Sequence, residues 1–127
     1  MENAHARTAG GIVLLKATRS GGVLTVCLSG EIDHCVCESL RGEIEALLED
    51  AGITKLVFDF SDVTFMDSSG VGLIIGRYKT VNARGGVTSA SGLHPPVDRL
   101  FRLAGLHRII QIEPSGGQTN TCTTTWN

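Results

Sequence analysis

The chain has 127 residues, of which 42% are hydrophobic and 19% charged, and its formal net charge is −2. These values are ordinary for one globular domain with a single core, and the lack of a basic block argues against nucleic acid as a partner. No apolar run approaches the roughly 20 residues that span a bilayer, and residues 1–11 lack the apolar core of a signal peptide. We therefore expect a cytoplasmic protein with no membrane partner.

The first third of the chain predicts a leader and two strands. Residues 1–11 read as a flexible leader that precedes the domain. Branched apolar residues over 12–18 and 23–29 predict two strands, joined by a hairpin-like turn at 19–22. Residues 30–33 then interrupt the apolar run, and we expect a loop there.

Helices and strands alternate in the middle of the chain. Apolar residues at helical spacing over 40–51 predict an amphipathic helix of about 14 residues, which Gly52 ends. Residues 56–60 form a nearly continuous apolar run, as expected for a central strand. A second apolar stripe over 71–81 predicts the next helix, which ends at Gly85 and Gly86.

The last third adds a strand, a helix and a final strand. Residues 87–91 predict a strand, and Pro95 and Pro96 open a helix that Gly105 stops. Residues 106–112 predict the last strand. Beyond this strand, residues 114–127 are rich in Gly and Thr, and we expect them to be disordered.

This order of elements predicts an α/β fold. Alternation of strands and helices favours right-handed crossovers and parallel pairing, whereas the first two strands favour an antiparallel hairpin. We therefore expect a single domain over residues 12–113, built on a mixed sheet of about five strands flanked by helices.

The four cysteines do not form a recognisable metal motif. Cys27 lies in an apolar strand and reads as a small core residue. Cys35 and Cys37 stand beside His34, but a structural zinc site needs about four ligands in paired spacings, and no second pair is visible. We therefore expect no metal, and Cys122 in the tail receives no role.

The segment Asp67-Ser68-Ser69-Gly70, followed by Gly72, joins a strand to a helix. One interpretation is structural, because Asp and Ser side chains cap helix N-termini by accepting a backbone N–H bond. Another is functional, since a hydroxyl at the positive end of a helix dipole is well placed to carry a phosphate. Glycine costs about 1 kcal/mol in a helix relative to alanine, so Gly70 and Gly72 favour close approach by another backbone or protein.

A second polar segment, Glu31-Ile32-Asp33-His34, follows the strand over 23–29. It reads either as a turn with solvated charges or as a binding segment. The carboxyl ends of parallel strands meet at one sheet edge, where ligands and partners usually bind in α/β folds. On the second interpretation, Asp33 lies at the same sheet edge as Ser68.

Two alternative functions, serine hydrolysis and nucleotide binding, lack the sequence motifs that they require. A serine hydrolase of the nucleophile-elbow type requires G-x-S-x-G, but Met66 and Asp67 precede Ser68, so the first glycine is missing. Nucleotide binding through Gly70 and Gly72 lacks both the G-x-G-x-x-G spacing and the P-loop sequence. We predict that the chain is not an enzyme and binds no cofactor.

The chain resembles the STAS-domain family and, within it, the anti-sigma factor antagonists of the sporulation type. The string D-S-S-G-V-G at residues 67–72, with G-E-I-D-H upstream at residues 30–34, carries the resemblance. Further matching segments occur in order at residues 76–79, 96–101 and 105–106, so the likeness spans about residues 12–113.

The resemblance implies a regulatory phosphoprotein whose partner is an anti-sigma factor that is itself an ATP-binding serine kinase. The unphosphorylated form would bind this kinase and release a sigma factor, phosphorylation of Ser68 would switch binding off, and a phosphoserine phosphatase would restore it. The resemblance and the sheet-edge argument together predict these partner-binding residues: Glu31, Asp33, His34, Asp67, Ser69, Gly70, Gly72 and Arg77. The sigma factor is left open, and the alternatives are a STAS scaffold in another signalling or lipid-transport complex, or a small nucleotide-binding protein.

Overall fold

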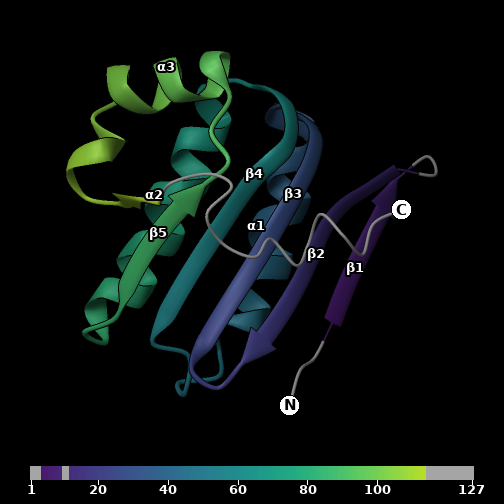
Figure 1. Cartoon of the computed structure of the whole chain (residues 1–127). Helices are drawn as coiled ribbons and strands as arrows, with labels where there is room; N and C mark the ends of the chain where they lie inside the picture. Colours follow the sequence, from purple (N-terminus) through teal and green to yellow (C-terminus); the bar gives the residue numbers. More distant parts are fainter. Residues whose placement is uncertain (1–3, 10–11, 114–127) are drawn as a thin grey trace.

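The computed structural model describes residues 4–9 and 12–113 of the chain. Six strands form one sheet in which spatial order follows chain order (Figure 1). The strands are β1 (Ala4–Ala9), β2 (Ile12–Ser20), β3 (Val23–Ile32), β4 (Lys55–Met66), β5 (Val87–Ser91) and β6 (Gln111–Ile112). The helices are α1 (His34–Leu47), α2 (Ser68–Ala83), α3 (Pro95–Leu103) and the short 3₁₀ helix η1 (Leu106–Arg108).

The sheet is mixed, as predicted. β1 to β3 pair antiparallel, whereas β3 to β6 pair parallel. The crossovers between the parallel strands carry α1, α2 and α3 in turn, which is the arrangement that strand–helix alternation favours. The predicted α/β class and the single domain are confirmed.

The predicted leader is partly wrong, because residues 4–9 form β1 within the sheet. Ala4 pairs with Thr18 and Ala9 with Ile12. The free edge of β2 offers unpaired backbone groups, and any extended segment can satisfy them whatever its side chains. This strand raises the number from about five to six. The remaining leader residues and the predicted tail, residues 114–127, lie outside the described residues.

Two boundaries also differ from prediction at the start of α1. β3 continues through Gly30 to Ile32, so the expected loop at 30–33 is absent, and α1 begins at His34 rather than near residue 40. Gly30 has a φ of +86°, and the pairing of β3 with β4 shifts register on both sides of it. A bulged strand can thus pass polar residues without ending.

The last predicted strand is shorter than expected. Gly105, at a φ of +78°, turns the chain into η1, so only Gln111 and Ile112 remain in β6. β4, by contrast, extends beyond its apolar centre at 56–60 to Met66. The length of β4 matters for the site, because it carries the chain to the start of α2.

A single core lies between the sheet and its helices. Leu40 and Ile44 of α1 and Leu73 and Ile74 of α2 are fully buried in it. The two helices contact each other and lie behind the sheet in Figure 1. α3 lies at the end of the sheet where β5 finishes. Its Phe101 ring packs edge to face on Phe60, which in turn stacks on Phe58. Among the described residues, no helix combines the length and apolar character needed to cross a bilayer.

Candidate functional site

Two neighbouring strands pass directly into helices through a single aspartate. Asp33 follows β3 and caps α1, and Asp67 follows β4 and caps α2. Their backbone angles are nearly the same, with φ of −109° and −106° and ψ of −174° and −172°. Oδ1 of Asp33 accepts a hydrogen bond from the Val36 amide at 3.1 Å, and Oδ1 of Asp67 accepts one from the Ser69 amide at 2.8 Å.

The two junctions lie side by side. Ile32, the last residue of β3, pairs in parallel with Met66, the last residue of β4, and the Asp67 amide donates a hydrogen bond to the Ile32 carbonyl at 3.3 Å. The next residues, Asp33 and Asp67, therefore occupy equivalent places at one sheet edge. The predicted placement of Asp33 at the edge that carries Ser68 is correct.

Ser68 is the first residue of α2, and its side chain is exposed. Because Asp67 supplies the cap, the Ser68 hydroxyl is not used for capping, and no hydrogen bond to it is found within residues 12–113. Ser69 is half-buried, and its amide is the one that Asp67 binds. Of the two hydroxyls, Ser68 is the more accessible to an enzyme that transfers a phosphate.

The two glycines of the turn have different surroundings. A Cβ on Gly70 would overlap the side chain of Met66 and would lie 3.6 Å from Ile32 Cγ2. Gly70 is therefore explained by packing within the chain, and it is buried. Gly72 is exposed, and a Cβ there would meet nothing within 4 Å. Only Gly72 leaves open surface for a partner to approach.

Phe65 was not singled out as a site residue from the sequence, but its side chain is 48% exposed at this edge. It pairs in register with Glu31 of β3, which is also exposed. The signal in the sequence was an aromatic residue two positions before the polar turn. An exposed aromatic side chain beside the junctions is a common feature of protein-binding surfaces. His34, the first residue of α1, is exposed as well.

Arg77 does not belong to this exposed surface. It is 8% exposed, and its Nε lies 2.7 Å from Oε2 of Glu45 on α1. Burial lowers the pKa of the Arg77 guanidinium, and the opposing effect of the Glu45 carboxylate only partly offsets this. Thr80 Oγ1 also donates to Glu45 Oε2, at 3.1 Å. The predicted docking role of Arg77 is therefore at odds with its place, and its contacts hold α1 against α2.

The cysteines next to the site differ in burial. Cys35 is exposed in the first turn of α1, whereas Cys37 is buried. Burial raises the pKa of the Cys37 thiol, and the nearby Asp67 carboxylate adds to this effect. Cys27 is buried, as predicted for a core residue. Over the described ranges, no group of three or more His, Cys, Asp or Glu side chains converges as a metal site would require.

The model of the STAS domain family matches residues 15–118 of this sequence. The chain belongs to the STAS domain family. The match includes both capped junctions and all three α-helices, so the site described above is part of the family's domain.

The relatives of this STAS chain carry related names. This chain is 40% identical over 91 residues to the anti-sigma F factor antagonist of Paenibacillus polymyxa, and the alignment covers 72% of this chain and 78% of that protein. This chain is also 34% identical over 89 residues to the anti-sigma-B factor antagonist of Bacillus subtilis, and that alignment covers 70% of this chain and 80% of the relative. The solved structure of the anti-sigma factor antagonist SpoIIAA in its unphosphorylated form superposes with a TM-score of 0.70 at 24% identity, covering 96% of this chain and 93% of that one.

Proposed function

We propose that this STAS chain is an anti-sigma factor antagonist whose binding is controlled by phosphorylation of Ser68. The observation that carries the proposal is an exposed hydroxyl at the first position of α2, left unused because Asp67 caps the helix. The names of the curated relatives, which include antagonists of sigma F and sigma B regulators, support the same role. The identity to the sigma F relative is the higher of the two, which favours a sporulation pathway.

The proposed partner is an anti-sigma factor that is also a serine kinase. In its unphosphorylated form the chain binds this kinase in the cytoplasm and so frees a sigma factor; a phosphatase reverses the modification. The docking surface comprises exposed residues around the two junctions and three half-buried ones, Asp33, Asp67 and Ser69, at its centre. The exposed residues are Glu31, His34, Phe65, Ser68 and Gly72. The chain itself acts as substrate and ligand rather than as an enzyme.

Electrostatics provide the switch. A phosphoserine carries roughly −1.5 to −2 charges near pH 7, and it would be placed beside the carboxylates of Asp33 and Asp67. The positive ends of α1 and α2 make that charge tolerable to the fold, so no refolding is needed. In an interface, however, like charges facing each other can cost several kcal/mol, enough to release the partner.

The direct test is phosphorylation of the purified chain by the anti-sigma factor of the same organism with ATP. We expect phosphopeptide mass spectrometry to place one phosphate on Ser68, because Ser69 is less accessible. A Ser68→Ala variant serves as the control and should remain unmodified. Phosphate on Ser69 alone, or none on the wild-type chain, would contradict the proposal.

Asp33 has both a structural and a proposed binding role, and two substitutions separate them. Asp33→Ser keeps an oxygen that can cap α1, whereas Asp33→Ala removes the cap and should cost about 1 kcal/mol of unfolding free energy. If the carboxylate contacts the partner, both variants will bind the anti-sigma factor more weakly. Urea denaturation and titration of each variant give the two quantities, and a binding loss confined to Asp33→Ala would assign the residue to folding alone.

A further inference from the structure

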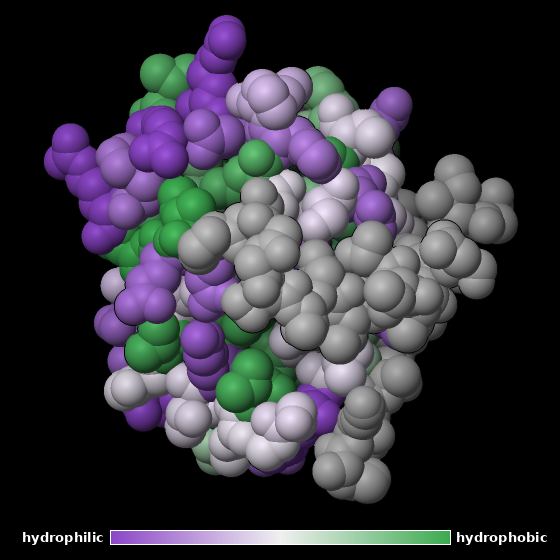
Figure 2. All heavy atoms as spheres, in the orientation of Figure 1, coloured by the Kyte–Doolittle hydropathy of each residue, from purple (hydrophilic) through white to green (hydrophobic). Residues whose placement is uncertain are grey.

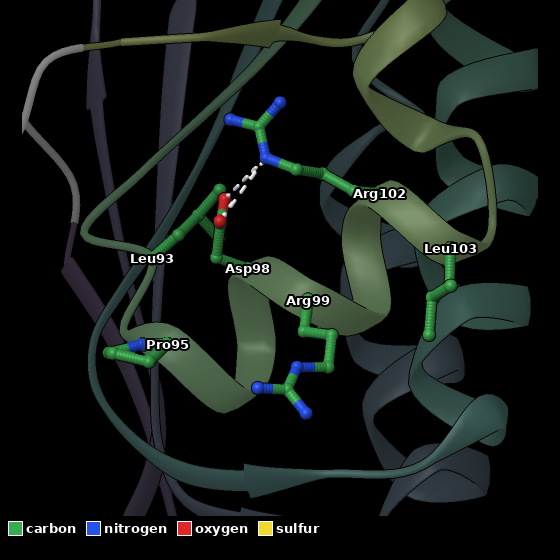
Figure 3. Close-up of a pocket in the computed structure, with 6 residues that line it drawn as sticks. All are labelled: Leu93, Pro95, Asp98, Arg99, Arg102 and Leu103. Atoms are coloured by element: carbon green, nitrogen blue, oxygen red, sulfur yellow. Dashed lines mark hydrogen bonds and ion pairs between the residues drawn. The ribbon is translucent and has the colours of Figure 1, made fainter.

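The outward side of α3 forms a hollow that the proposed function does not use. α3 buries Val97 and Phe101 against the core. Its other side borders a hollow of about 580 Å³ (Figure 3). We call this the α3 groove, and it is lined by Leu93, Pro95, Asp98, Arg99, Arg102 and Leu103.

The groove contains the most exposed large hydrophobic side chain among the described residues. Leu103 is 79% exposed, compared with 48% for Phe65. It lies one helical turn after Arg99, and both side chains point to the same side of α3 in Figure 3. Leu93 and Pro95 add apolar surface at the other end of the hollow. An exposed apolar side chain in a hollow, framed by charged groups, is a feature of protein-binding sites.

The charged residues that line the groove, Asp98, Arg99 and Arg102, sum to a positive charge although the whole chain is acidic. Between residues 93 and 110 the sequence contains one carboxylate, Asp98, and the arginines Arg99, Arg102 and Arg108. Arg102 pairs with Asp98 at 3.1 Å, but no carboxylate partner of Arg99 is found in the described part of the chain. Figure 2 shows the hydrophilic side chains gathered over α3 with hydrophobic ones between them.

We propose that the α3 groove docks an acidic, amphipathic segment of another protein. A carboxylate of the segment pairs with Arg99, and an apolar side chain of the segment packs against Leu103. A bare polyanion such as nucleic acid fits less well, because the apolar side chains of Leu93, Pro95 and Leu103 offer nothing to a phosphate backbone. The groove thus selects for charge and apolar surface together.

The test is selection of short random peptides, displayed on phage, against the immobilised wild-type chain. We expect the enriched peptides to carry a net negative charge and at least one large apolar side chain. Synthetic copies of them should bind about tenfold or more weakly to Arg99→Glu and to Leu103→Asp, and more weakly in high salt because the charges are exposed.

Lys79→Glu provides the matched control, because Lys79 is an exposed basic residue on α2, outside the groove. It should leave peptide affinity unchanged. Both groove substitutions are at exposed positions, so unchanged urea denaturation would show that the variants fold. The proposal is overturned if no peptide is enriched, if the enriched peptides are not acidic, or if Arg99→Glu and Leu103→Asp bind them as the wild type does.

Discussion

Replacing Ser68 with aspartate should weaken binding to the anti-sigma factor by tenfold or more. Ser68 is exposed at the start of α2, and the carboxylates of Asp33 and Asp67 already cap the two neighbouring helices. In the proposed interface one more negative charge at this place would face the partner, and about 1.4 kcal/mol of repulsion is enough for a tenfold loss of affinity. Isothermal titration of the wild type and the variant measures the effect.

Two further substitutions separate charge from size at the same position. In Ser68→Asn the asparagine side chain has nearly the volume of aspartate but no charge, and Ser68→Ala removes the hydroxyl. We expect both to bind the anti-sigma factor close to wild-type affinity. If Ser68→Asn binds as weakly as Ser68→Asp, bulk rather than charge controls docking, and the electrostatic mechanism is wrong.

The largest expected loss of stability comes from Gly92→Ala, at the turn between β5 and α3. Gly92 has a φ of +72°, and a Cβ there would lie 2.7 Å from the Ser61 amide nitrogen and 2.9 Å from Ser61 Cα. The left-handed backbone costs about 1–2 kcal/mol for a side chain, and overlap with a fixed backbone adds about 1–3 kcal/mol. The midpoint of urea denaturation should fall accordingly.

Gly105→Ala is the control for this prediction. Gly105 has a similar φ of +78°, but a Cβ there would meet nothing within 4 Å. Gly105→Ala should therefore lower the free energy of unfolding only by the cost of the left-handed backbone, about 1–2 kcal/mol. Equal losses for Gly92→Ala and Gly105→Ala would mean that the turn shifts away from Ser61 and that the close contact carries no energy.

The fold class could be predicted because hydrophobic periodicity reports on burial. The centres of β3, β4 and β5 and the buried stripes of α2 and α3 follow from apolar spacing. The start of α1 did not follow from apolar spacing. Gly30 and Glu31 interrupt the apolar run in the sequence, whereas in the structure the bulged strand β3 accommodates them. β1 could not be found from its side chains, since its place depends on backbone pairing with the edge of β2.

The candidate site was predicted in part for similar reasons. Asp33 and Ser68 follow strands that pair in parallel, and chain order alone brings their ends to one edge. Burial of Arg77 was not predictable, because a long side chain on a helix can face a neighbouring helix or solvent, and only the packing of α1 on α2 decides. The difference between Gly70 and Gly72 likewise depends on the Met66 side chain.

The twin aspartate caps have one more consequence. The Val36 and Ser69 amides, which could otherwise bind an arriving anion, already bind the chain's own carboxylates. A phosphate on the exposed Ser68 therefore does not gain hydrogen bonds from these two amides, and within the site its charge is moderated by the helix dipoles alone. The charge of the phosphorylated surface thus acts over a distance of several ångströms. An approaching partner can therefore distinguish the phosphorylated from the unphosphorylated form during diffusional encounter, before any contact forms.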